Sequence, residues 1–246
     1  MQITVRINGK PVSARDLRKW EKPALKWVCY NLGINIPKNV SVKELTRKLN
    51  SGKVHLSDDE IRSKVKGKIR LMDLGINLAL LISGNRHVYS ETTVFVDGLD
   101  AKYATEKINE INLNAEGDET YRRVNLSACP FHYILRTTPE KKLEVVEGIG
   151  RFMLPLQMFI KYGDDTGLSI PRLSGFPYQS VGCATMANGK IMGGVRHQFR
   201  DTKNGMEARL SVQFPKACPK FIVRNHQYHL AVEFSNWLHW IAENRE

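Results

Sequence analysis

Residues 181–214 read VGCATMANGKIMGGVRHQFRDTKNGMEARLSVQF, and this stretch indicates the fold class of the chain. It contains two Asn-Gly pairs, Asn188-Gly189 and Asn204-Gly205, each lying between runs of strand-forming residues. Asn-Gly is favoured at the centre of tight hairpin turns because both residues tolerate a positive φ. The stretch therefore predicts three antiparallel strands across Val181–Phe214.

Segments on either side of this stretch predict further strands and one long loop. The expected strands are Ile3–Ile7, followed by an Asn8-Gly9 turn, then His87–Asp97, one or two strands within Tyr121–Thr137, and Phe221–Phe234. Pro155 interrupts the apolar run Arg151–Lys161. The segment Gly163–Gly182 is rich in Gly, Pro and Ser, and a long loop is expected there.

Helix-start signals occur mainly in the first third of the chain. Ser41 and Ser57 each precede a glutamate by three residues, the spacing of an N-terminal capping box. Helices are predicted over Ala14–Glu21, Pro23–Leu32, Ser41–Asn50, Asp100–Ile111 and Thr138–Glu147, and a C-terminal helix capped by Ser235 carries Trp237 and Trp240. The segment Arg62–Arg70 fits a helix or a strand, and either gives a basic row backed by an apolar face.

These patterns predict an α+β fold in two regions. Residues 1–82 are expected to form a basic, mainly helical region that binds a polyanion. It is packed on or joined to residues 83–246, an α+β body with antiparallel hairpins and a C-terminal helix. The Trp237 helix is expected to dock on its own sheet rather than to form an oligomer contact.

The positive charge of the chain is concentrated in its first third. The chain has 37 Lys and Arg against 25 Asp and Glu, a net charge of +12. Residues 1–72 contain 17 of these bases and 6 of the acids, so almost the whole excess precedes Asp73. A localised excess of this kind indicates a partner with many negative charges, because phosphate contacts are made mainly by Lys and Arg.

The bases of this region are the candidate binding residues for a nucleic acid. They are Arg15, Arg18, Lys19, Lys43, Arg47, Lys48, Lys53, Arg62, Lys64, Lys66, Lys68 and Arg70. Trp20, Trp27 and Tyr30 lie among them and could stack on bases, although their spacing favours packing in a core. No base-reading motif is present, so binding to the phosphate backbone is expected.

The cysteines and the hydropathy of the chain indicate a location. Cys29, Cys129, Cys183 and Cys218 are scattered and form no C-x-x-C pair, which is typical of buried free thiols in a reducing compartment. No apolar run approaches about 18 residues, the length of a membrane span. The sequence also begins without an apolar signal segment. We therefore expect an intracellular protein, cytoplasmic or nuclear.

Two groups of residues suggest chemistry, and neither is favoured as a site. Tyr162-Gly163-Asp164-Asp165 resembles the GDD hairpin of RNA-dependent polymerases, in which carboxylates hold metal ions. The chain is too short for such an enzyme, so solvated turn residues are favoured. His226-x-x-His229 and Cys129-x-x-His132 could share a zinc ion. On the expected Phe221–Phe234 strand, however, His226 and His229 would point to opposite faces.

The sequence therefore predicts a non-enzymatic protein with no metal and no cofactor. It contains no P-loop, no G-x-S-x-G and no dinucleotide fingerprint. The first hypothesis is an assembly protein that binds nucleic acid, preferably RNA, or a nucleoprotein, and forms a homo-oligomer through its body, by analogy with viral matrix, nucleocapsid and movement proteins. The alternatives are a peripheral protein on an anionic membrane, although no amphipathic anchor is evident, and a nucleic-acid-processing enzyme.

Overall fold

Nine strands form one open antiparallel sheet within residues 1–113, 118–149 and 154–245, the part of the chain that this computed structural model describes. The strands are β1 (Ile3–Ile7), β2 (Lys10–Val12), β3 (His87–Asp97), β4 (His132–Thr137), β5 (Leu143–Gly148), β6 (Pro155–Tyr162), β7 (Tyr178–Thr185), β8 (Ile191–Thr202) and β9 (Gly205–Pro215). Their order across the sheet is β2-β1-β3-β9-β8-β7-β6-β5-β4. Most neighbours in the sheet are therefore also neighbours in the chain.

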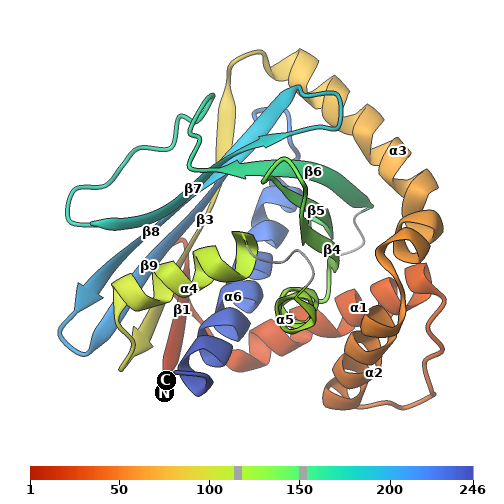
Figure 1. The fold of residues 1–246 in the computed structure, drawn as a ribbon, viewed down its shortest axis with the longest axis horizontal. Helices are drawn as coiled ribbons and strands as arrows, with labels where there is room; N and C mark the ends of the chain where they lie inside the picture. The colour runs from red at the N-terminus through yellow and green to blue at the C-terminus, as the bar shows by residue number, and fades with distance from the viewer. Residues whose placement is uncertain (114–117, 150–153, 246) are drawn as a thin grey trace.

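Six helices accompany the sheet in the described ranges. They are α1 (Ala14–Leu32), α2 (Val42–His55), α3 (Asp58–Ser83), α4 (Ala101–Leu113), α5 (Glu119–Ala128) and α6 (Lys220–Glu243). Helices α1–α3 form the N-terminal group, and the long α6 lies against the sheet together with α4 and α5 (Figure 1). The predicted α+β class is confirmed, with helices first, an antiparallel sheet and a C-terminal helix packed on it.

The Asn-Gly turns and the Ser57 capping box form as expected, whereas Ser41 accepts a hydrogen bond from the Glu44 amide without the reciprocal bond of a full box. The pair Asn188-Gly189 lies in the turn between β7 and β8, where Gly189 has a φ of +81°, and Asn204-Gly205 joins β8 to β9. The Ser57 side chain accepts a hydrogen bond from the Glu60 amide, and the Glu60 carboxylate accepts one from the Ser57 amide. Arg62–Arg70 therefore belongs to a helix, α3.

Helix α1 corrects the prediction of two helices separated at Pro23. It is a single helix that contains Pro23, and it ends at Gly33 with a left-handed φ of +71°. Trp20, Ala24 and Val28, spaced four residues apart, are all buried. This continuous apolar face stabilises one helix and outweighs the hydrogen bond that proline cannot make.

Two other predictions in the second half of the chain were wrong, and a third, one or two strands across Tyr121–Thr137, was right only for β4. Phe221–Phe234 is helical and belongs to α6, so Ser235 lies inside that helix and does not cap it. Tyr121–Ala128 is also helical, as part of α5, and a strand begins only at His132. Thr138–Glu147 holds a turn and strand β5 instead of a helix. Helix α6 is buried around much of its circumference, so its sequence lacks the polar stripe that would identify it as a helix.

Two hydrophobic cores hold the elements together. The first lies between the sheet and helices α4 and α6, and it includes Val94, Leu210, Phe234 and Trp237, so the predicted docking of the Trp237 helix on its own sheet is confirmed. The second joins α1–α3 to the body. Both cores contain residues from either side of residue 82, because Met72 lies in the first and Val232 in the second.

The two edge strands of the sheet differ in length and in burial. Strand β2 has three residues, one of which is Pro11. Strand β4 is almost entirely buried and contacts α3, α4 and α5. Among the described helices, none is both long enough and apolar enough to cross a membrane.

Candidate functional site

Four ionisable side chains meet in the interior, between the sheet and α6. We call His132, Glu147, His229 and Glu233 the His–Glu cluster. His132 begins β4 and lies opposite Glu147 of β5 in the strand register. His229 and Glu233 are four residues apart on α6, so they share one face of that helix. All four side chains are buried.

Four pairs of side-chain atoms in the cluster lie within 4 Å of each other. The His132 and His229 Nε2 atoms are 3.1 Å apart, and His132 Nε2 lies 3.2 Å from the Glu233 Oε1. The Glu147 Oε2 lies 3.5 Å from His229 Nε2 and 3.7 Å from His132 Nε2. Two nitrogen and two oxygen atoms therefore converge on one small volume.

The hydrogen bond of His132 fixes which of its nitrogens faces the cluster. Its Nδ1 lies 2.7 Å from the carbonyl oxygen of Asn125, which can only accept, so Nδ1 carries a proton. The Nε2 of neutral His132 is then an acceptor that points into the cluster, toward the His229 Nε2. Metal-bound histidines commonly hold their second nitrogen in this way.

Two more potential ligands lie beside the cluster. The Cys129 Sγ lies within 4.8 Å of ring nitrogens of both His132 and His229. His226 lies one turn before His229 on α6, and ligand atoms of these two histidines and Glu147 also lie within 4.8 Å of one another. The Nδ1 of His226 is 3.1 Å from the Ser90 hydroxyl.

Burial shifts the pKa of every member of the cluster towards the neutral form. It lowers the pKa of His132 to about 3 and that of His229 to about 4, although Glu233 acts against the second shift. Burial raises the pKa of Glu233 to about 7. Burial and the adjacent Glu233 carboxylate raise the pKa of Glu147 well above its usual range. A positively charged ligand is therefore the partner that would stabilise this cluster most.

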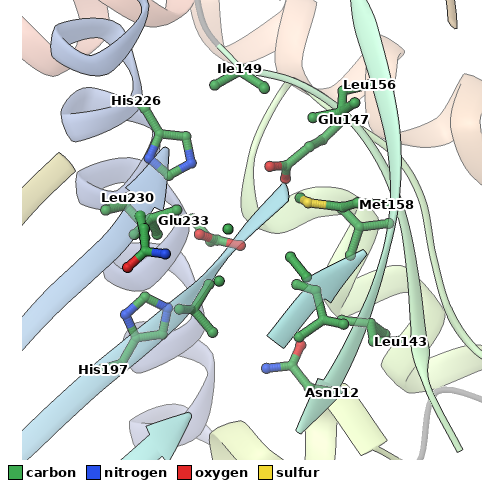
Figure 2. A pocket seen from close by; sticks show the side chains of 18 of the residues that line it. Asn112, Leu143, Glu147, Ile149, Leu156, Met158, His197, His226, Leu230 and Glu233 are labelled. Atoms are coloured by element: carbon green, nitrogen blue, oxygen red, sulfur yellow. The ribbon is translucent and has the colours of Figure 1, made fainter. Parts of the chain in front are cut away.

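A mostly apolar cavity of about 70 Å³ adjoins the cluster. Figure 2 shows the carboxylates of Glu147 and Glu233 pointing into this space from opposite sides, with His226 and His197 beside Glu233. The cavity has room for a few waters or one very small molecule. The Asn112 Oδ1 and His197 Nδ1 are buried without a hydrogen-bond partner, and both residues line it.

The sequence interpretation did not identify the His–Glu cluster as a site. It named His226, His229, Cys129 and His132, but the strand expected around His229 would have kept the first two apart. On a helix, residues at positions i, i+3 and i+7 share a face, and His226, His229 and Glu233 have this spacing. Glu147 could not be recognised because it was placed in a predicted helix.

Lys53 was predicted to bind nucleic acid, and its position contradicts that role. The side chain is completely buried, and its Nζ donates hydrogen bonds to the carbonyl oxygens of Leu126, Cys129 and Pro130, at 3.0, 3.2 and 2.8 Å. These carbonyls lie at the C-terminal end of α5, the negative end of its dipole. Lys53 therefore joins α2 to the body and has no access to a partner.

Arg62 was also predicted to bind nucleic acid, and it is engaged inside the protein. It forms an ion pair with Glu144, a residue that is only 2% exposed and that also pairs with Arg136. A polyanion would have to compete with this buried carboxylate for the guanidinium. Arg62 therefore connects α3 to the sheet.

The remaining predicted bases lie on three helices. Lys48 is half-buried, and Lys19 forms an exposed pair with Asp16. No ion pair within the described residues engages the others, which are Arg15, Arg18, Lys43, Arg47, Lys64, Lys66, Lys68 and Arg70. The α1 bases lie near the start of that helix. The Lys68 Nζ lies over the ring of Tyr30 near the end of α1, and the ring is 73% exposed rather than packed in a core.

The bases at the start of α1 and those of α3 do not form one continuous patch. Arg18 and Tyr30 are separated by about 18 Å along α1, at 1.5 Å per residue. The bases of α3 are therefore a separate group from those at the start of α1. We call Lys64, Lys66, Lys68 and Arg70 the basic segment of α3.

The two acids of the GDD-like segment lie in the turn after β6. Asp164 pairs with Lys161 at 3.1 Å and accepts a hydrogen bond from the Thr166 amide. Asp165 pairs with Arg196 at 2.9 Å. The carboxylates thus have separate partners.

Comparisons with known proteins do not assign the chain to a family. No protein-family model matches it, and no curated protein is significantly similar to it. The proposals below therefore rest on the chemistry of the residues alone.

Proposed function

We propose that this chain is a non-enzymatic binding protein that holds one divalent transition-metal ion in the His–Glu cluster. The observation that carries this proposal is the spacing of the four ligand atoms. In a tetrahedral zinc site with bonds of about 2.0–2.1 Å, neighbouring ligand atoms lie about 3.3–3.4 Å apart. Four of the six distances among these ligand atoms, 3.1, 3.2, 3.5 and 3.7 Å, bracket this value. His229 and Glu233 lie farther apart and form no ion pair, so Glu233 would have to shift toward His229 to complete the shell.

The donor set indicates the class of metal. Two imidazole nitrogens and two carboxylate oxygens suit zinc, iron, manganese or cobalt better than calcium or magnesium. Four ligands from the protein would fill a tetrahedral shell, as in structural zinc sites, whereas catalytic sites leave one position open. This filled shell supports a structural or regulatory role for the ion and a protein that is not an enzyme.

Metal analysis of the purified chain tests this proposal. We expect about one transition-metal ion per chain, and after chelation we expect Co²⁺ to restore one equivalent with the absorption of a tetrahedral site. His229→Gln and Glu233→Gln should each lower the metal content strongly. His239→Gln is the matched control, because His239 lies on the same helix and is exposed. A folded wild-type chain that binds none of these four metals would contradict the proposal, and hydrogen bonds alone would then explain the cluster.

A second candidate function is binding of a polyanion by the exposed bases of the N-terminal helices. The supporting observation is the basic segment of α3, whose four side chains have no ion-pair partner within the described residues. In one form of this proposal the partner is a nucleic acid, preferably RNA, or a nucleoprotein. In the other form the partner is an anionic membrane. Both kinds of partner agree with an intracellular location, cytoplasmic or nuclear. The four free thiols support that location. Self-association through the body remains part of this proposal.

Charge reversal tests the second function. The variant Lys64→Glu, Lys66→Glu, Arg70→Glu should lose most of its affinity for heparin and for RNA, and the remaining binding should depend less on salt. The triple variant Lys190→Glu, Lys203→Glu, Lys216→Glu, at exposed positions of the body, is a control for net charge alone. Unchanged affinity in a folded triple variant would contradict this assignment of the surface.

A further inference from the structure

The outer face of α3 changes from basic to apolar along its length. Leu71, Leu74, Leu78 and Leu81 recur at spacings of three and four residues, which places them on one face of the helix. This face points away from the body, so Leu74 is 68% and Leu81 is 77% exposed. We call these four residues together with Ile82 the leucine stripe.

The inner face of the same half of α3 is also apolar. Met72 and Ile76 are buried in the core between the sheet and α6. The leucine stripe is therefore not needed to attach α3 to the protein. Exposed apolar surface of this extent on one helix marks a contact site in most soluble proteins.

The charges next to the leucine stripe have one sign. Between residues 61 and 83, α3 carries five bases and a single acid, Asp73. Asp73 is half-buried, and burial raises the pKa of its carboxyl group. The exposed charges that precede the stripe are those of the basic segment, and Arg86 follows the helix at its other end.

We propose that the leucine stripe and the basic segment of α3 together dock the protein on an anionic lipid bilayer. This inference rests on the second function proposed above and names the partner of that surface. Interfacial helices combine Leu and Ile, which enter the boundary between headgroups and acyl chains, with Lys and Arg, which contact anionic headgroups. Nucleic acid matches the basic segment but gives no role to five exposed apolar side chains.

Charge also favours a bilayer over a second copy of the chain. Each copy carries a net charge of +12, and pairing of two leucine stripes would bring two basic segments to one interface. Like charges at that distance repel, whereas phosphatidylserine and phosphoinositide headgroups attract them. Complementary charge is therefore available only on the lipid surface.

An apolar groove of about 300 Å³ extends this face into the body. It lies between α3 and the start of α6, and its walls include Met72, Ile76, Leu78 and Ile82 on one side and Cys218 and Ile222 on the other. Leu78 and Ile82 belong to the leucine stripe and to the groove. The apolar surface that faces the bilayer is thus continuous with a space that an acyl chain could occupy.

Flotation of the full chain with lipid vesicles tests this inference. The chain should bind vesicles of phosphatidylcholine with phosphatidylserine and bind poorly to phosphatidylcholine alone. The variant Leu74→Gln, Leu78→Gln, Leu81→Gln should lose at least about tenfold in vesicle affinity, because these side chains would enter the interface. Its affinity for RNA should be unchanged. Ile191→Gln, an exposed apolar residue of the body, is the matched control.

Each contrary result has a distinct meaning in this experiment. Vesicle binding that the leucine variant retains would overturn the inference, since charge alone would then explain it. Binding to RNA but not to vesicles would overturn it and leave the polyanion-binding function in place. A dimer that the same variant dissociates, without vesicle binding, would assign the leucine stripe to a second copy. Loss of all polyanion binding would reject both proposals.

Discussion

Arg62 on α3 and Glu144 on β5 form a two-point ion pair, with Nη1–Oε1 and Nη2–Oε2 distances of 2.5 and 3.2 Å. The pair joins the basic helical region to the sheet. Its carboxylate is almost inaccessible to water, and its guanidinium is about a quarter exposed. Removal of the arginine would leave part of the buried negative charge uncompensated.

Arg62→Ala should therefore lower stability without affecting polyanion binding. We expect the free energy of unfolding to fall by about 1–3 kcal/mol, because Arg136 and Gln157 still contact Glu144. Denaturant unfolding measures this change. Arg70→Ala is the matched control and should do the reverse, with little loss of stability and weaker binding to anionic partners. Weakened binding in Arg62→Ala alone would contradict the interpretation of the ion pair.

The buried Lys53 should make stability depend on pH above neutrality. Burial lowers its pKa to about 7, from an ordinary value near 10.5. Between these pH values the unfolded chain binds a proton that the folded chain does not, so stability should rise with pH by up to about 1.4 kcal/mol per unit. Lys53→Met should remove this rise, measured as the difference from wild type across pH 7–10.

Lys53→Met should also leave binding to heparin, RNA and anionic vesicles unchanged, because the ammonium group is inaccessible. Lys43→Met, on the same helix and exposed, is the control for loss of a surface lysine. Parallel profiles for wild type and Lys53→Met would show that the three carbonyl groups around Lys53 hold its charge despite burial.

If the proposed metal ion is bound, its removal should destabilise the protein. A ligand that binds only the folded state adds about 4 kcal/mol at a free concentration of 1,000 times its Kd, so chelation should lower the Tm. The decrease in Tm on chelation should be absent in Glu233→Gln and as large in His239→Gln as in wild type. Thermal unfolding with and without a chelator measures it. Equal Tm values for wild type under both conditions would argue against a bound ion.

His197 should contribute to acid denaturation independently of the metal. Burial lowers its pKa to about 3, so between pH 6.5 and 3 the unfolded state takes up a proton that the folded state does not. Stability should fall with decreasing pH in this window by up to about 1.4 kcal/mol per unit. The stability of His197→Leu should fall less steeply than that of wild type, and an equally steep fall would contradict the assignment to His197. Unfolding measured at several pH values decides between these two outcomes.

The sequence was most informative where a local signal decides the structure. The Asn-Gly turns and the capping serines act through their own backbone and nearest neighbours, so β7–β9 and the starts of α2 and α3 were predicted correctly. Helix α6 was misread in its first half because His226, Leu230 and Phe234 face the core while residues on its other sides are buried as well. Helical periodicity is lost when most positions are apolar.

The candidate site was hidden for a related reason. His132 and His229 come from segments 97 residues apart, and only the packing of α6 against β4 and β5 brings them together. The basic surface was overestimated because sequence gives charge without burial, so Lys53 and Arg62 counted as available. The leucine stripe was not predicted, because the sequence does not show which face of an apolar helix the fold leaves exposed.

The two ends of the sheet have a consequence for assembly. An exposed outer strand offers unpaired amide and carbonyl groups on which a second chain can add another strand. Here β2 is short and contains Pro11, which lacks an amide hydrogen, and β4 is buried beside α5. Edge-to-edge polymerisation is therefore disfavoured at both borders, so partners of this chain are expected to bind through side-chain contacts.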